Sequence, residues 1–367
     1  MNGLFSGIYK DKRVFLTGHT GFKGSWLSAW LKHIGAEVCG FSLSPATDPN
    51  HFTLVNPEME SNIGNLSQRE KLKKTIQDFQ PDIVFHLAAQ PLLRYSYEAP
   101  HETYETNVLG TLNLFEAARQ CDSVQAMVII TTDKVYENNE WEWGYREIDR
   151  LGGYDPYSSS KACAEILCSA YRKSYFNPEE YGEKHNVLIA TARAGNVIGG
   201  GDWAKDRLIP DIIRSTVSGK KTPIRHPEAT RPWQHVLDSL SGYLQLGSSL
   251  LSGSMSAAEA FNFGPQENDN LSVDSICRQV KSCWESADFE YPEIPDKPHE
   301  AGLLRLDSSK AKSKLGWKPV WESGQAIKKT VEWYRDYYHK NLVNTLSDIE
   351  SYVTEAQKKG IIWTKKS

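Results

Sequence analysis

Tyr157 and Lys161 are spaced for proton transfer. Asp155 and Pro156 come directly before Tyr157 and predict the start of a helix, because Asp is a favourable N-cap and Pro fits the first helical turn. On that helix the i, i+4 spacing places the phenol and the ammonium on one face. A nearby cation lowers the pKa of a phenol, so we expect Tyr157 to accept the proton of a hydroxyl group. The alternative is an ordinary helix face, because the spacing is common.

A glycine-rich segment near the start of the chain has the spacing of a dinucleotide-binding loop. Gly18 permits a tight turn, Gly21 a close approach of a pyrophosphate, and Gly24 close packing of the following helix on the preceding strand. The helix N-terminus would offer free N–H groups to the phosphates. The predicted cofactor loop is Gly18, His19, Thr20, Gly21, Phe22, Lys23 and Gly24. A merely structural turn is the alternative.

The residue that would select between NAD and NADP is missing from the sequence. At residues 40–44 the chain reads GFSLS, with neither an acid for a ribose nor an arginine for a 2′-phosphate, so this rule leaves the choice open. Asn65 is a candidate to accept a hydrogen bond from an adenine amino group through its amide oxygen. Its alternative is an ordinary turn asparagine.

These side chains require elements that bring them to one edge of a sheet. Short apolar runs at 14–17, 37–41, 83–87, 126–131 and 187–192 alternate with helical patterns at about 24–34, 67–79, 101–120 and 157–175. This alternation predicts an α/β fold with a doubly wound parallel sheet and crossover helices. Beyond residue 195 the alternation breaks down, and we expect a strand at 261–263, helices near 272–285, 307–315 and 323–340, and a solvated tail at 358–367.

Composition excludes several function classes. The 367 residues include 42 Lys and Arg against 46 Asp and Glu, a net charge of −4, so the chain has no global basic field for nucleic acid and must bind any phosphate locally. Its six cysteines form no CxxC pair and show no zinc-ligand spacing, which favours reduced thiols and no metal site. No apolar window approaches the ~20 residues of a membrane helix. We expect a cytoplasmic protein.

Taken together, these motifs resemble the extended short-chain dehydrogenase/reductase superfamily, whose members carry a TGxxGxxG loop, a YxxxK pair and an upstream Ser or Thr. The matching segments are 17–24, 86–90, 106–111 and 157–161, and segments 193–197, 231–238 and 315–317 resemble members that modify nucleotide sugars. The resemblance implies a Rossmann fold and NAD as cofactor. It adds Leu66, Leu87, Ala88, Ala89 and Asn107 to the cofactor site, together with Tyr157 and Lys161.

Thr132, Asp133 and Lys134 narrow the resemblance to nucleotide-sugar 4,6-dehydratases, which carry Thr-Asp-Glu at this position. Lys134 departs from that pattern, and with segments 199–203 and 298–301 it resembles the members that act on CDP-glucose. The resemblance implies that Tyr157 takes the C4 hydroxyl proton, that Thr132 binds the same oxygen, and that Asp133 protonates the departing C6 hydroxyl. Lys134 is the candidate base for the C5 proton and must then be neutral; alternatively, it orients Asp133 or the substrate.

The resemblance also implies a substrate cleft. Arg231 and Asn196 are candidates for the diphosphate, because guanidinium and amide groups suit phosphate oxygens. Weaker candidates for the cleft are Gln90, Arg94, Asp202 and Trp203, with Trp233 nearby, while His86 and His235 are expected to be structural. We expect an NAD-binding Rossmann domain of residues 1–192 with about 236–265, and a smaller C-terminal α/β nucleotide-sugar-binding domain of about 193–235 and 266–357.

Two other functions fit the same motifs. A nucleotide-sugar 4-epimerase would share fold and cofactor, but Asp133 argues against it because 4-epimerisation has no leaving group to protonate. A cofactor-binding regulatory protein without activity is disfavoured by the intact Thr132, Tyr157 and Lys161. The resemblance further implies a homodimer or homotetramer, with helices 101–120 and 157–175 in an intermolecular four-helix bundle, and a role in making 3,6-dideoxyhexoses of bacterial surface polysaccharide such as O-antigen.

Overall fold

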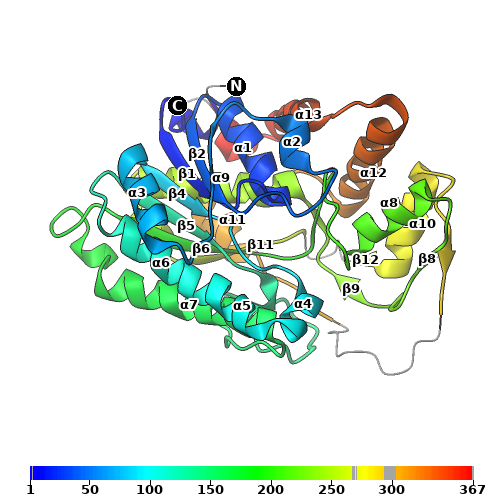
Figure 1. The fold of residues 1–367 in the computed structure, drawn as a ribbon, viewed down its shortest axis with the longest axis horizontal. Helices are drawn as coiled ribbons and strands as arrows, with labels where there is room; N and C mark the ends of the chain where they lie inside the picture. Colours follow the sequence, from blue (N-terminus) through cyan, green and yellow to red (C-terminus); the bar gives the residue numbers. More distant parts are fainter. Residues whose placement is uncertain (2, 267–268, 270, 293–302, 366–367) are drawn as a thin grey trace.

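The structure, a computed structural model, describes residues 1, 3–266, 269, 271–292 and 303–365. Its centre is a seven-stranded sheet in which all neighbouring strands are parallel, in the order β11-β6-β5-β4-β1-β2-β3 (Figure 1). The strands are β1 (Arg13–Thr17), β2 (Glu37–Ser42), β3 (Glu60–Ile63), β4 (Ile83–His86), β5 (Ala126–Ile130), β6 (Leu188–Ala194) and β11 (Ala260–Phe263). The predicted doubly wound Rossmann sheet is confirmed.

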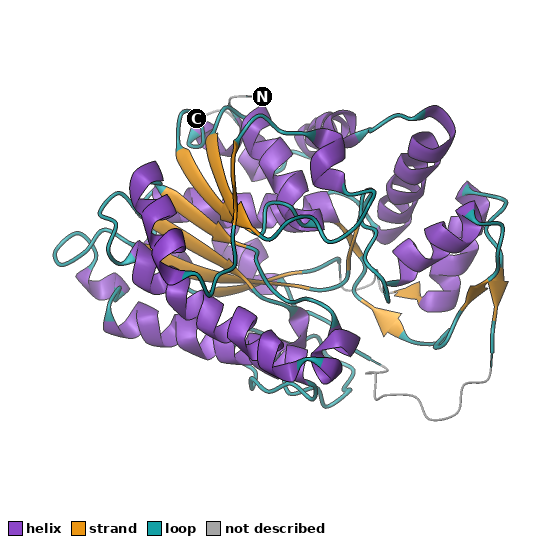
Figure 2. Ribbon diagram, in the orientation of Figure 1, coloured by secondary structure: helices purple, strands orange, loops and turns teal. Residues whose placement is uncertain are grey.

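Helices cover both faces of this sheet (Figure 2). One face packs on α1 (Phe22–His33), α9 (Val236–Leu251) and α11 (Ser309–Leu315), and the other on α3 (Arg69–Phe79), α6 (Gly110–Ala118) and α7 (Pro156–Ser174). Because both faces are covered, β4, β5 and β6 are buried along their whole length. β5 reads as a continuous apolar run, whereas β4 ends in His86 and β6 includes Thr191 and Arg193.

The helix predicted at 101–120 is divided in the structure. It consists of α5 (Pro100–Tyr104), a π-helical turn (Glu105–Leu109) and α6. Asn107 lies in this π turn, where its amide oxygen accepts from the backbone N of Gln90 and its amide nitrogen donates to the Gln90 carbonyl and to Ser160 Oγ. The turn therefore ties the loop after β4 to α7.

A smaller group of elements lies beyond the carboxyl edge of the sheet, at the right of Figure 1. It contains α8 (Leu208–Val217), α10 (Val273–Cys283), α12 (Ser323–Lys340) and three two-stranded pairs. The pairs are β7 (Val197–Ile198) with β10 (Gln234–His235), β9 (Thr230–Arg231) with β12 (Leu271–Ser272), and β8 (Thr222–Pro223) with β13 (Phe289–Glu290). Two short helices, α2 (His51–Val55) and α4 (Leu93–Glu98), lie between sheet strands in the sequence.

The end of the chain differs from the expected solvated tail. Helix α13 (Thr345–Lys358) packs on α1, and Trp363 beyond it is only 2% exposed and stacks on Phe5 with ring centroids 5.1 Å apart. Among the described residues of this segment, Ile361 is buried as well. Burial of the apolar side chains that lie between the lysines stabilises the packed position of this segment, although its lysines suggested a solvated tail.

Candidate functional site

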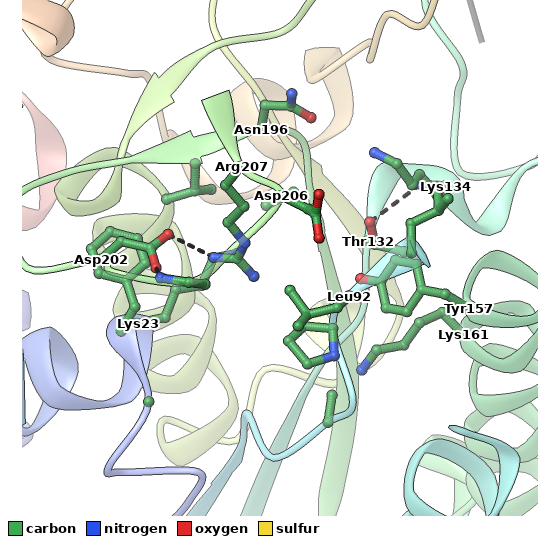
Figure 3. A pocket seen from close by; sticks show the side chains of 18 of the residues that line it. Lys23, Leu92, Thr132, Lys134, Tyr157, Lys161, Asn196, Asp202, Asp206 and Arg207 are labelled. Atoms are coloured by element: carbon green, nitrogen blue, oxygen red, sulfur yellow. Dashed lines mark hydrogen bonds and ion pairs between the residues drawn. The ribbon is translucent and has the colours of Figure 1, made fainter. Parts of the chain in front are cut away.

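A cavity of about 1210 Å³ lies between the carboxyl ends of the sheet strands and the smaller group of elements (Figure 3). In a doubly wound sheet this edge is the usual ligand site, because the loops after the strands converge there. The predicted site residues that line it are Gly18, Thr20, Gly21, Phe22, Lys23, Gly24, Asn65, Leu66, Leu87, Ala88, Ala89, Arg94, Thr132, Asp133, Lys134, Tyr157, Lys161, Asn196, Asp202, Trp203 and Arg231. Trp233 lines it as well.

His19, Gln90 and Asn107 lie behind the cavity wall. The His19 ring is buried, with Nε2 2.7 Å from Ser61 Oγ, and burial lowers its pKa to about 4. The Gln90 side chain donates to Thr103 Oγ1 and accepts from the backbone N of Leu92. These groups support the loops that carry the site.

The glycine loop forms a narrow cradle between β1 and α1. Gly18 has φ +76°, and a Cβ there would come within 2.7 Å of the Ala88 backbone nitrogen; a Cβ on Gly24 would overlap the Gly18 carbonyl oxygen. A Cβ on Gly21 would meet only the Gly18 carbonyl oxygen, at 3.4 Å. Gly21 is also the N-cap of α1, so the free N–H groups of the first helical turn lie at this wall. This cradle fits a dinucleotide pyrophosphate.

The ribose end of the loop has hydroxyl groups where an acid is more common. Thr20 Oγ1 lies 2.8 Å from Ser42 Oγ and donates to the Leu43 carbonyl, and Leu43 lines the cavity. Asn65 also lines the cavity, but its amide oxygen accepts from the Ser67 backbone N at 2.9 Å. Asn65 therefore makes the hydrogen bond of an ordinary turn asparagine, which was the alternative to its role at the adenine.

Tyr157 and Lys161 extend from the first turns of α7 into the cavity (Figure 3). Asp155 caps α7 as predicted, accepting from the Ser158 backbone N at 2.9 Å. The expected lowering of the phenol pKa is not found: burial raises the pKa of Tyr157 to about 12, and this outweighs the Thr132 hydroxyl and the charge of Arg207, which lower it. Burial also lowers the pKa of Lys161 to about 8, and its Nζ donates to the Ile130 carbonyl at 3.2 Å.

Thr132, Asp133 and Lys134 follow the carboxyl end of β5. Thr132 Oγ1 donates to Asp133 Oδ1 at 2.9 Å, and the Asp133 side chain is 1% exposed. Asp133 Oδ2 is buried without a hydrogen-bond partner among the described residues, and Asp133 lines the cavity. Lys134 Nζ lies 3.8 Å from Asp133 Oδ1, at an ion-pair distance.

Arg207 is a cavity residue that sequence reasoning missed. It is the N-cap residue of α8, and its guanidinium reaches into the cavity from the side opposite Tyr157 (Figure 3). Asp202 Oδ2 accepts from Arg207 Nη1 at 2.8 Å, so Asp202 holds this arginine in place. Lys23 lies on the same side, and burial, with Arg207 as the next cause, lowers the pKa of Lys23 to about 7. The one sequence signal for Arg207 is weak: a cation just before a helix start is electrostatically unfavourable, because the N-terminal end of a helix is itself positive.

The remaining substrate candidates also line the cavity. Arg231 belongs to β9 and Asn196 precedes β7. Arg94 of α4 lies 3.5 Å from Asp206, which also pairs with Arg225, another lining residue that the sequence did not suggest. The Trp203 ring is buried against Trp333 and its indole nitrogen donates to Tyr338.

The two histidines expected to be structural are buried and bonded within the protein. His86 Nδ1 lies 2.7 Å from Thr17 Oγ1, and its Nε2 lies 3.0 Å from Thr111 Oγ1. His235 is the N-cap of α9, and its Nδ1 accepts from the Leu237 backbone N. The prediction is confirmed for both.

Sequence comparison decides the family. The family model described as GDP-mannose 4,6 dehydratase matches residues 15–330. The chain belongs to this family. The CDP-glucose 4,6-dehydratase of Salmonella typhimurium is 48% identical over 351 residues, which cover 95% of this chain and 98% of that protein. The dTDP-glucose 4,6-dehydratase of the same organism is 28% identical, with 88% and 92% covered.

Solved structures of other proteins have the same fold as this chain. A UDP-glucose 4-epimerase from Thermotoga maritima superposes with a TM-score of 0.76 at 21% identity, covering 89% of this chain and all of that one. A dTDP-glucose 4,6-dehydratase from Streptomyces venezuelae, solved with NAD bound, has a TM-score of 0.75 at 23% identity and covers 88% and 97%. Across the described residues, no helix combines the length and apolar character needed to span a bilayer.

Proposed function

We propose that this protein is an NAD-dependent CDP-glucose 4,6-dehydratase, a hydro-lyase that converts CDP-D-glucose to CDP-4-dehydro-6-deoxy-D-glucose and water. The observation that carries the proposal is the Asp133 carboxyl with a free buried oxygen beside Thr132 and Tyr157, in a chain 48% identical to a protein of that name. The glycine cradle fits NAD, which when bound accepts a hydride from the sugar's C4 and returns it to C6.

Each side chain then has one task at a stated atom. Tyr157 accepts the proton of the C4 hydroxyl, and Thr132 binds the same oxygen; the Lys161 ammonium supports the phenolate. The resulting 4-keto group acidifies the C5 proton. Asp133 protonates the C6 oxygen as water departs, and its buried free Oδ2 suits that task. When hydride returns to C6, a proton returns to C5, which completes the 4-keto-6-deoxy sugar.

Lys134 is our candidate for the base that removes the C5 proton. It lines the cavity and is 27% exposed, so it can reach a substrate in the cavity. Its contact with Asp133 favours the alternative in which an ammonium orients the carboxyl, because a base must be neutral. Both tasks place Lys134 at the elimination step.

Arg231 and Asn196 are proposed to bind the diphosphate, and Arg207 is a further cation on the cavity wall. Arginine suits this task because its planar fork binds two phosphate oxygens at once. Gln90 is proposed to act from behind the wall, because its side chain already bonds Thr103 and the Leu92 backbone.

Product formation tests the function directly. Purified protein incubated with NAD and CDP-glucose should yield a 4-keto-6-deoxy product with alkali-induced ultraviolet absorbance. Parallel incubations with dTDP-glucose and GDP-mannose test the nucleotide preference, which the cavity residues do not reveal. No absorbance with any of the three substrates would overturn the dehydratase proposal, and conversion to a galactose isomer instead would establish the epimerase.

We also propose a cytoplasmic homo-oligomer that supplies the 4-keto-6-deoxy precursor of 3,6-dideoxyhexoses in surface polysaccharide. Neighbouring helices expose large apolar side chains, with Leu109 47% and Ile166 58% exposed, which supports pairing through α5, α6 and α7. The six unpaired thiols support a reducing compartment. Light scattering of the purified protein tests the oligomer, and a monomer would contradict it.

A further inference from the structure

Glu165 and Arg193 form a buried ion pair that the proposed reaction does not use. Glu165 lies on α7 and Arg193 on β6, and their side chains are 3% and 4% exposed. Arg193 donates through Nε to Oε1 and through Nη2 to Oε2 of Glu165, both at 2.9 Å. This two-pronged geometry fixes distance and orientation together.

Glu165 continues the row of side chains that begins with Tyr157 and Lys161. The three residues are spaced at i, i+4 and i+8, so they lie on one face of α7. That face meets the carboxyl end of β5 and the residues after it: Lys161 Nζ donates to the Ile130 carbonyl, and Thr131 Oγ1 donates to Glu165 Oε1 at 2.5 Å.

Tyr157, the first member of the row, lines the cavity with Thr132, the next residue of that segment, and the Thr132 hydroxyl lowers the pKa of the phenol. Two turns of α7 are therefore joined to residues 130 and 131, and the turn before them carries the phenol that faces the same cavity as residue 132. Any shift of α7 along β5 would separate the phenol from the hydroxyl that shares its substrate oxygen.

Arg193 extends these contacts to neighbouring strands. Thr191 of β6 donates to Glu165 Oε2 at 2.8 Å, and Arg193 Nη1 donates to the Tyr136 hydroxyl at 2.8 Å. Tyr136 in turn donates to Asn262 of β11. Replacing a buried ion pair by apolar side chains is often neutral or stabilising, so stability alone explains this pair poorly.

We propose that Glu165, held by Arg193, is a positioning residue that sets α7 on the end of β5 so that Tyr157 and Thr132 meet one substrate oxygen. The inference rests on the proposed function. Glu165 acts through Tyr157 and Lys161 and does not touch the substrate.

The charge of Glu165 gives this role a measurable signature. Burial lowers the pKa of Lys161, while Cys168 and Glu165 on its own helix raise it. The other titratable groups near Lys161 are Lys23 of α1, His86 of β4 and Tyr157. Without the Glu165 carboxylate, Lys161 loses its proton at lower pH, so the alkaline limb of kcat should move to lower pH.

Glu165→Gln tests the proposal, with Glu116→Gln as matched control. Glu116 of α6 is also bonded to an arginine and a tyrosine, Arg119 and Tyr171, but lies outside the cavity wall. We expect Glu165→Gln to lower kcat at least about tenfold with KM for CDP-glucose changed less than threefold, and to move the alkaline limb down by about one pH unit. The control should keep the wild-type values.

A double variant separates positioning from folding. Glu165→Met with Arg193→Met leaves no unpaired buried charge, so it should keep a near-wild-type Tm and still show the lowered kcat. A double variant with wild-type kcat and pH profile would overturn the proposal, as would a Glu165→Gln protein with an unmoved pH limb. The wild-type assay with CDP-glucose, run first, reports on the proposed function separately.

Discussion

Burial and nearby charge act in opposite directions on the pKa of Tyr157. Burial raises the pKa of its phenol to about 12, which would keep it protonated at neutral pH. The Thr132 hydroxyl and the Arg207 guanidinium act in the other direction. Lys161 donates one N–H group to the Ile130 carbonyl, which leaves its other N–H groups for the phenolate, and the Arg207 cation across the cavity also favours phenolate formation.

Arg207→Gln should therefore move the acid limb of kcat to higher pH. Loss of this cation makes the phenolate harder to form, and a pKa higher by one lowers the phenolate fraction about tenfold, so we expect kcat at pH 7 to fall by about that factor. The measurement is a pH profile of kcat beside Arg278→Gln, which removes an exposed arginine of α10. An unmoved acid limb would remove Arg207 from this role.

The task of Lys134 is decided by isotope exchange. If Lys134 removes the C5 proton, Lys134→Met should lose the incorporation of solvent deuterium at C5 by at least about 10²-fold, the usual contribution of a positioned base. Hydride removal from C4 should continue, visible as transient NADH absorbance. Exchange at the wild-type rate would instead assign Lys134 to orienting Asp133.

Single residues were predictable where a motif fixes their place. The glycine loop apart from His19 lines the cavity, and so do Thr132, Tyr157 and Lys161, because each follows a strand end or helix start that local sequence identifies. Arg207 was not predicted because it enters the cavity only through the tertiary placement of α8. Its partner Asp202, a weaker sequence candidate for the sugar cleft, lines the cavity and accepts a hydrogen bond from the arginine.

At the scale of elements, the contact between β1 and α1 makes the cofactor cradle. Gly24→Ala should abolish NAD binding, since its Cβ would overlap the Gly18 carbonyl oxygen and push the loop from the helix end. NAD-dependent stabilisation in thermal melts measures this, with Gly324→Ala as control. Gly324 also lies in the first turn of a helix, α12, and its Cβ would meet only Gln279 Oε1 at 3.6 Å. Equal NAD-induced Tm shifts in both variants would contradict the cradle.

Elements were predictable where the sequence carries a short apolar run or an amphipathic stripe. The central strands read as apolar runs and α3 and α7 have one apolar face, whereas α9 was not predicted because it is buried on nearly all sides and contains Gly242, Gly247 and several serines. The division that assigns 266–357 to a second domain stays a prediction. In the structure α11 packs on α9 and β11, and α13 packs on α1, so these helices lie with the sheet.

At the scale of the whole molecule, the net charge of −4 is compatible with anionic ligands because cations are concentrated locally. Lys23, Arg94, Arg207, Arg225 and Arg231 all line the cavity, beside the positive end of α1. Electrostatic attraction at this wall falls off within about 10 Å at moderate salt, so the acidic remainder of the surface does not repel a bound diphosphate.

The second long-range feature is a buried carboxyl that joins the end of the chain to the sheet-bearing part. Asp238 of α9 accepts through Oδ1 from the Val320 backbone N and from the Tyr352 hydroxyl of α13. Its Oδ2 has no partner among the described residues. Burial raises the pKa of Asp238 to about 7, which outweighs these hydrogen bonds.

This carboxyl makes stability depend on pH. The ordinary aspartate pKa is 3.8, so between pH 4 and pH 7 the folded chain holds a proton at Asp238 that the unfolded chain has lost. The free energy of unfolding therefore has its full value with respect to this group below pH 4, and it falls as pH rises toward 7, by at most about 4 kcal/mol. Asp238→Asn stays neutral throughout, so its unfolding free energy relative to wild type should increase from pH 4 to pH 7. Urea unfolding at both pH values measures this, with the exposed Asp78→Asn of α3 as control. A constant difference between Asp238→Asn and wild type would mean that this carboxyl is ionised in the fold, and that the contact between α9 and α13 is made by a charge.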